Sequence, residues 1–308
     1  MTDSSEVISP SIGSFTAHNI LLPDGSRTIP DKSDLLADHG PMQAARRVLD
    51  LLFPYGPKQR SIADLGCLEG GYTLEFARLG MRALGIEVRQ SNFENCMAIK
   101  EAFPHLRNLN FIKDDVWNIR NYGKFDTIFC CGLLYHLDRP MEFIRLLGET
   151  SRYAIIVNTH IAISSKDASE RLSDMTENEG VPGRWFHEYD PDSTDPAALE
   201  QKNWQSWANY RSFWPSAPAL LNAMQYAGFD LLFEQADWLS PDIPGSMTGS
   251  LYASWGRRTF VGIRTKMSGR GLLGSLLARA HQIRPRSVHF RSAKTARVTP
   301  SRTPKSPK

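Results

Sequence analysis

Residues Ser61 to Gly71 read Ser-Ile-Ala-Asp-Leu-Gly-Cys-Leu-Glu-Gly-Gly, and this stretch decides how the chain folds. Residues 62 to 65 are apolar apart from one aspartate, which predicts the end of a buried parallel strand. Three glycines, Gly66, Gly70 and Gly71, then let the backbone turn tightly before a helix begins. Because a helix N-terminus presents unpaired N–H groups to a ligand, the stretch predicts a nucleotide-cofactor loop. Glycine-rich turns of this kind also occur for structural reasons alone.

Polar or small residues follow the next three predicted strands. Ala83 to Glu87 ends in a carboxylate about 20 residues after the loop, the spacing at which an acidic side chain meets ribose hydroxyls. The strand at 109–112 leads into Asp115, and the strand at 125–131 leads into Gly132. Open α/β sheets bind ligands at the carboxyl ends of their strands, so these residues are expected at one site.

Together these motifs resemble those of class I S-adenosylmethionine-dependent methyltransferases. The resemblance covers roughly residues 55 to 160 and rests on Asp64 to Gly70, Glu87, Asp115 with Val116, and Asp126 to His136. A hydride-transferring dehydrogenase would more usually show Gly-x-Gly-x-x-Gly, a register that this loop lacks. The sequence departs from the family at Leu68, where a glycine is common.

The resemblance implies S-adenosylmethionine as the cofactor and a set of residues around it. Glu87 is expected on the ribose hydroxyls, where its spacing also puts it. The other cofactor residues implied are Asp64, Gly66, Cys67 and Gly70 in the loop, Asp115 and Val116 near adenine, and Cys131 and Gly132 beneath the methionine moiety. A competing role for Asp64 is to brace the loop.

Strands and helices alternate through the rest of the core. Helices are predicted at 72–79, 90–103, 139–149 and 215–226, a fifth strand at 152–158, and two closing strands at 229–234 and 259–264. The alternation predicts an α/β fold with right-handed crossovers and a ligand crevice between the first and fourth strands. The resemblance implies a Rossmann-like, seven-stranded, mostly parallel sheet that ends in an antiparallel hairpin.

Three regions are predicted along the chain. Residues 1–40 are expected to form an N-terminal extension with a small hairpin at Asp24-Gly25, and the resemblance implies a methyltransferase domain at 41–265. Residues 266–308 contain eleven Lys or Arg and no acid, which predicts a basic amphipathic helix and a disordered tail. Without this tail the chain has 25 basic against 33 acidic residues, so its body is acidic although the net charge is +3.

The chain is expected to be a cytoplasmic protein. It has 41% hydrophobic residues, no apolar run of membrane-spanning length and a polar N-terminus without a secretory pattern. Its four cysteines, Cys67, Cys96, Cys130 and Cys131, form no Cys-x-x-Cys pair and are expected to be reduced packing thiols. The sequence leaves the oligomeric state open.

Residues 161–210 are polar but rich in aromatic side chains, which predicts a lid over the acceptor. The expected substrate-binding residues are Trp185, His187 and Tyr210 in this lid, and Arg211 directly after it.

Tyr135 and His136 follow the fourth strand and are predicted to face the transferred methyl group. A histidine there could take a proton from an acceptor hydroxyl at neutral pH. The alternative is a hydrogen-bonded residue of the cavity wall. His160, His187, Glu188 and Asp190 match no metal-ligand spacing, so no metal is predicted.

Two short pieces, residues 132–140 and 209–216 ahead of a helix, resemble the subgroup that contains tRNA wobble-uridine carboxymethyl-transferring enzymes. The acceptor is therefore left between two classes. A small-molecule or glycan-like acceptor fits the acidic body. An RNA acceptor would use the basic tail for phosphates and the aromatics for stacking. A catalytically silent binding module is the third alternative.

Overall fold

The computed structural model describes residues 14–163, 170–192, 195–202 and 204–265. Its centre is a seven-stranded sheet in the order β3-β2-β1-β4-β5-β10-β9. These strands are β1 (Ser61–Leu65), β2 (Arg82–Glu87), β3 (Leu109–Lys113), β4 (Phe125–Cys131), β5 (Ser151–His160), β9 (Leu231–Glu234) and β10 (Arg257–Ile263). The helix and tail predicted for 266–308 lie outside the described residues.

The sheet is parallel from β3 to β5 and antiparallel at β10 and β9. β1 pairs with β2 on one side and with β4 on the other, so the strand order reverses between β1 and β4. The predicted Rossmann-like fold, its closing antiparallel pair and its crevice are confirmed. The crevice forms because the chain leaves β1 and β4 toward opposite sides of the sheet.

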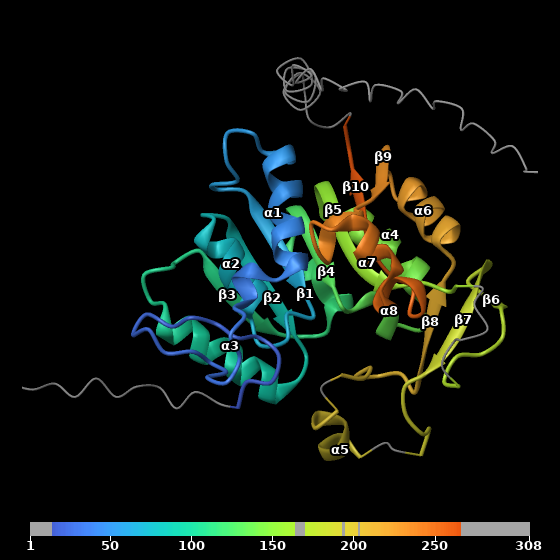
Figure 1. The fold of residues 1–308 in the computed structure, drawn as a ribbon, viewed down its shortest axis with the longest axis horizontal. Helices are drawn as coiled ribbons and strands as arrows, with labels where there is room; N and C mark the ends of the chain where they lie inside the picture. The colour runs from blue at the N-terminus through green and yellow to red at the C-terminus, as the bar shows by residue number, and fades with distance from the viewer. Residues whose placement is uncertain (1–13, 164–169, 193–194, 203, 266–308) are drawn as a thin grey trace, which may run out of the picture.

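Helices cover both faces of this sheet (Figure 1). They are α1 (Gly40–Leu52), α2 (Gly71–Arg78), α3 (Gln90–Ala102), α4 (Pro140–Thr150) and α6 (Ala217–Tyr226). Neighbouring residues of a strand belong to the cores on opposite faces of the sheet. Ile62 is in the core with α1, α2 and α3, whereas Ala63 is in the core with α4 and α6. This two-residue alternation explains why each strand reads as a continuous apolar run.

A second sheet departs from the predicted lid loop. β6 (Thr176–Asn178), β7 (Val181–His187) and β8 (Arg211–Pro215) form an antiparallel sheet in that order, beyond the edge of the α4 and α6 layer (Figure 1). Between β7 and β8 the chain makes the short helix α5 (Pro196–Glu200). The sequence does not indicate β7 as a strand, because it contains Pro182 and Gly183, and both residue types are rare in strands.

The N-terminal segment and the last connection complete the described chain. The Asp24-Gly25 turn forms, but Leu21 and Arg27 make a single antiparallel bridge rather than a full hairpin. Between β9 and β10 lie α7 (Ile243–Thr248) and α8 (Ser250–Ala253). Short 3₁₀ turns occur at η1 (Leu36–Asp38), η2 (Val116–Tyr122), η3 (Leu134–His136) and η4 (Ala236–Trp238).

Candidate cofactor and acceptor site

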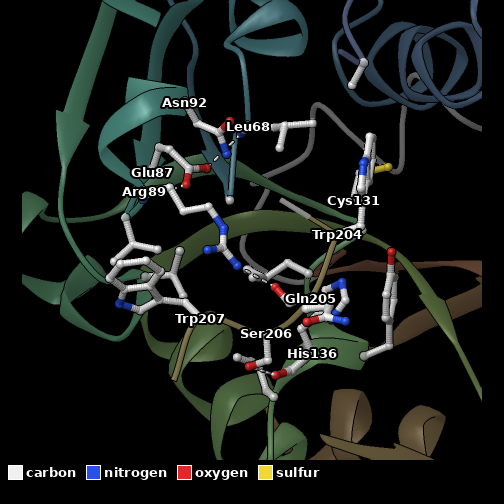
Figure 2. Close-up of a pocket in the computed structure, with 18 of the residues that line it drawn as sticks. Leu68, Glu87, Arg89, Asn92, Cys131, His136, Trp204, Gln205, Ser206 and Trp207 are labelled. Atoms are coloured by element: carbon white, nitrogen blue, oxygen red, sulfur yellow. Dashed lines mark hydrogen bonds between the residues drawn. The ribbon is translucent and has the colours of Figure 1, made fainter. Parts of the chain in front are cut away.

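A cavity of about 790 Å³ opens at the carboxyl ends of β1, β2 and β4 (Figure 2). Its size suits a small organic ligand with part of a second molecule. Three sequence-distant segments line it besides the sheet: the N-terminal extension, the turn after β4 and residues 204–209, which are the stretch before β8. The predicted site residues that it brings together are Gly66, Glu87, Asp115, Val116, Cys131, Gly132, Tyr135 and His136.

The cofactor loop is fixed by the carboxylate at the end of β2. Glu87 accepts the backbone N–H of Leu68 at 2.9 Å through one oxygen and that of Arg89 at 2.9 Å through the other. Leu68 has a φ of 52°, a left-handed conformation that glycine adopts more easily. The hydrogen bond to Glu87 holds the Leu68 backbone in this conformation. Burial raises the pKa of Glu87.

Three predicted loop residues lie beneath the cavity rather than in its lining. Asp64 is 2% exposed and accepts the Thr73 hydroxyl at 2.6 Å. Cys67 Sγ lies 3.7 Å from Cys96 Sγ in the core. Gly70 has a φ of 78° and is the N-cap of α2. Asp64, Cys67 and Gly70 are thus absent from the cavity lining, and they shape the loop through these buried contacts and this turn.

The buried carboxyl of Asp64 makes the stability of this loop depend on pH. Burial raises its pKa from 3.8 to about 7. Its neutral form therefore stabilises the fold below pH 4, and this contribution is lost as the pH rises toward 7, by up to about 4 kcal/mol. Asp64→Asn cannot ionise, so its free energy of unfolding relative to wild type should increase between pH 4 and pH 8. Urea unfolding of both proteins at the two pH values measures this, and a pH-independent difference would contradict it.

The far end of β4 joins β5 and β10 through one guanidinium. Arg257 donates from Nε to Asn158 Oδ1 at 2.6 Å, and its carbon lies 4.6 Å from the centre of the Tyr135 ring. A Cβ added to Gly132 would lie 3.5 Å from this guanidinium. Burial raises the pKa of the Cys131 thiol to about 11, so the group next to the cavity is a neutral thiol.

Two histidines near this end have different environments. His160 donates from Nδ1 to the Trp255 carbonyl at 2.7 Å and accepts from Arg257 at Nε2. Burial and Arg257 lower its pKa to about 3, so it is a neutral buried group stacked on Trp214. His136 instead lines the cavity, and its Nδ1 lies 2.8 Å from Glu188 Oε1.

The predicted substrate residues lie apart from the cavity. Trp185, His187, Tyr210 and Arg211 are absent from its lining, although His187 and Arg211 pair in the register of β7 and β8. Arg211 lies over the Trp185 ring at 4.2 Å, and His187 Nε2 lies 3.5 Å from Asp190. The aromatic residues of this region that do line the cavity are Trp204 and Trp207.

Sequence reasoning missed several lining residues. Arg89 donates to the Leu199 and Gln205 carbonyls, the latter at 2.7 Å, and its guanidinium lies 5.1 Å from the Trp207 ring (Figure 2). It ties α3 to the segment that ends the lid. The signal in the sequence was a basic residue two positions after Glu87, which reads as an ordinary exposed residue without the structure.

The N-terminal extension forms part of the cavity wall next to the glycine-rich loop. Glu69 accepts the backbone N–H groups of Thr16, Ala17 and His18 at 2.6 to 3.1 Å. His18 Nδ1 in turn accepts the Gly71 N–H at 3.0 Å, and burial lowers its pKa to about 3. Thr16, Ala17 and His18 all line the cavity. The extension is thus bound to the glycine-rich loop itself.

The lining chemistry fits S-adenosylmethionine. Gln205 lines the cavity, and its buried Oε1 accepts no hydrogen bond from the described residues, so it can accept one from a ligand. Each oxygen of Glu87 retains lone-pair capacity for ribose hydroxyls. Asp115 also lines the cavity and accepts the Trp117 N–H at 3.0 Å through Oδ1. The lining thus contains acceptors for the hydroxyl and amino donors of a nucleoside.

A family model described as "Methyltransferase domain" matches residues 37–233. Among curated proteins, the chain is similar to two described as tRNA U34 carboxymethyltransferase. It is 25% identical over 158 residues to the protein of Campylobacter fetus subsp. fetus, covering 51% of this chain and 52% of that protein. It is 26% identical to the protein of Sulfurimonas denitrificans, covering 51% and 50%. The chain spans about half the length of these relatives.

Among solved structures, the chain is similar to the N-terminal domain of EvdMO1 in the presence of SAH and D-fucose. The TM-score is 0.56 at 21% identity, with 83% of this chain and 91% of that chain covered. A second structure of the domain, with SAH bound, gives 0.53 at 22% identity and covers 74% and 82%. Both share the fold. Within the described part of the chain, no helix has the length and apolar content to cross a membrane.

Proposed function

Since this chain belongs to the methyltransferase-domain family, we propose that it transfers a methyl group from S-adenosylmethionine to an oxygen or nitrogen of a small-molecule or glycan-like acceptor. Family membership and fold confirm the predicted class I S-adenosylmethionine-dependent methyltransferase. The acceptor class and the roles of individual residues are the proposal. One observation carries it: a single cavity joins the cofactor loop and Glu87 to Tyr135 and His136.

The cofactor half of the cavity is the half nearest β1 and β2. When bound, S-adenosylmethionine supplies a methyl group on a positively charged sulfur. Glu87 would hold the ribose hydroxyls, Asp115 and Val116 would border the adenine, and Cys131 and Gly132 would lie beneath the methionine moiety. Asp64, Cys67 and Gly70 would act through the shape of the loop, because they do not line the cavity.

The acceptor half lies between η3 and the stretch before β8. His136 would take the proton of an acceptor hydroxyl or amine as the methyl group is transferred. Tyr135 would orient the acceptor, since its ring packs at 4.3 Å against that of His136. Trp204 and Trp207 would cover the acceptor and exclude water. The predicted contacts of Trp185, His187, Tyr210 and Arg211 with substrate would require an acceptor that extends beyond the cavity.

A second candidate is carboxymethyl transfer to a tRNA wobble uridine, the activity in the names of the relatives. Arg257 favours it. This guanidinium lines the cavity and takes part in none of the ion pairs among the described residues. A buried cation without an anionic partner is costly, so a carboxylate on the transferred group would stabilise it.

The two candidates differ in the molecule that is modified and in the group that is transferred to it. The full chain is incubated with methyl-labelled S-adenosylmethionine and cell extract, which is then separated into RNA, protein and small molecules, with sugars included in a defined acceptor panel. We expect label in small molecules or glycans. Label confined to RNA would overturn the first candidate. A parallel reaction, in which the sulfonium donor carries a carboxymethyl group and the acceptor is tRNA, tests the second by the mass added to the nucleoside.

A further inference from the structure

One carboxylate of the second-sheet region (residues 176–215) contacts His136, a residue that lines the cavity. Glu188 follows β7 directly and is 1% exposed. Its Oε1 lies 2.8 Å from His136 Nδ1 and accepts the Ser212 hydroxyl at 2.8 Å. Its Oε2 accepts the backbone N–H of Ser206 at 3.1 Å. Glu188 thus joins η3, the stretch before β8 and β8 itself at one buried point.

We propose that Glu188 is a positioning residue that holds the His136 ring with its proton on Nδ1 and with Nε2 as the proton acceptor in the cavity. This inference rests on the proposed role of His136 as the base. Glu188 does not line the cavity, so it acts through His136.

The hydrogen-bond partners of Glu188 decide the tautomer of His136. An ionised carboxylate only accepts hydrogen bonds, so the histidine nitrogen facing it must carry a proton. In a neutral imidazole the other nitrogen is then an acceptor. No hydrogen bond to the described residues occupies His136 Nε2, and the side chain lines the cavity. The basic nitrogen is therefore available to an acceptor molecule.

The same segment also fixes the main chain of His136. The His136 carbonyl accepts the Ser206 hydroxyl at 2.8 Å and the Asn209 side-chain amide at 3.2 Å. Ser206 lies beside His136 in the cavity wall (Figure 2). Because both the ring and the carbonyl are held, the imidazole has one orientation before any acceptor arrives, which lowers the cost of aligning it.

Glu188→Gln tests this geometry, because its hydrogen-bond partners allow the glutamine amide only one orientation. The Ser206 N–H needs an acceptor, which the glutamine oxygen provides. The amide NH₂ group then faces His136 Nδ1 and the Ser212 hydroxyl, both of which can accept. His136 should therefore place its proton on Nε2. The substitution keeps the volume of the side chain and changes which nitrogen is basic.

The full chain, uniformly labelled with ¹⁵N, is measured by two-bond proton–nitrogen correlation at a pH where the imidazole is neutral. His136→Gln identifies the signals of His136 among those of the eight histidines. Wild type should show Nδ1 protonated, and Glu188→Gln should change the ratio of the two tautomers by roughly 10- to 100-fold toward Nε2–H, the effect of a charge-assisted hydrogen bond. No acceptor substrate is needed.

Glu179→Gln is the matched control. Glu179 also belongs to the second-sheet region and accepts the N–H groups of Met141 and Glu142, both at 2.8 Å, at the start of α4. Glu179→Gln weakens the contact between the second sheet and α4 but changes no partner of His136. The tautomer of His136 in this variant should therefore match wild type. A wild-type ring protonated at Nε2, or equal shifts in both variants, would overturn the proposal. A tautomer that switches as expected, with transfer unaffected by His136→Ala, would instead overturn the proposed base and leave the positioning intact.

Discussion

Replacing His136 by alanine is expected to lower the rate of methyl transfer by about 10²- to 10⁴-fold, the usual contribution of a general base. His136 lines the proposed acceptor half of the cavity and makes its side-chain hydrogen bond to Glu188 rather than to the glycine-rich loop. The dissociation constant of S-adenosylmethionine should therefore change by less than about threefold. The loss of rate should shrink at higher pH, because the acceptor then loses its proton unaided.

Single-turnover kinetics with the acceptor found by labelling, together with calorimetric titration of the cofactor, measures both quantities. His105→Ala removes a histidine that is exposed and outside the cavity lining, and it should behave like wild type. Full activity in His136→Ala would show that the base lies elsewhere. A parallel loss of cofactor affinity would show that His136 has a structural role.

Replacing Glu87 by glutamine is expected to weaken S-adenosylmethionine binding by about 10- to 100-fold, or roughly 1.5 to 3 kcal/mol, the worth of charge-assisted hydrogen bonds. The substitution also removes an acceptor from either Leu68 or Arg89, because an amide has one oxygen where the carboxylate has two. Both effects act on the cofactor loop and in the same direction.

Calorimetric titration of the full chain with S-adenosylmethionine decides this prediction. Glu75→Gln is the matched control, since Glu75 is a buried carboxylate that pairs with Arg46 and Arg78 outside the cavity. It should lower the melting temperature without changing cofactor affinity. Equal affinities for wild type and Glu87→Gln would remove Glu87 from the cofactor site.

The proposed cofactor half of the cavity could be located from the sequence because its residues are local to single elements. The glycine-rich turn at 66–71 and the carboxylate at 87 end buried strands, and a buried parallel strand is visible as an apolar run. Even the departure at Leu68 could be located, although only the structure shows that its left-handed backbone is held by Glu87.

The acceptor half could not be predicted in the same way. β6, β7 and β8 are short, and β7 contains Pro182 and Gly183, so local propensity indicates a loop. The contact between Glu188 and His136 spans 52 residues, and in the sequence Glu188 is one acidic residue in a polar stretch. Arg257 begins the last strand, where nothing local distinguishes it from Arg258.

The sequence by itself determined the family resemblance, the order of strands and helices around the central sheet, and the glycine-rich loop that borders the cavity, because hydrophobic period and glycine placement act over a few residues. The tertiary structure decided which side chains share the cavity. Four distant segments line the cavity only after the sheet is assembled: the N-terminal extension, η3, the stretch before β8 and the start of β10. Arg257 reaches the cavity because β10 inserts antiparallel between β5 and β9. Contacts between such distant segments depend on the packing of whole elements, which local pattern does not encode.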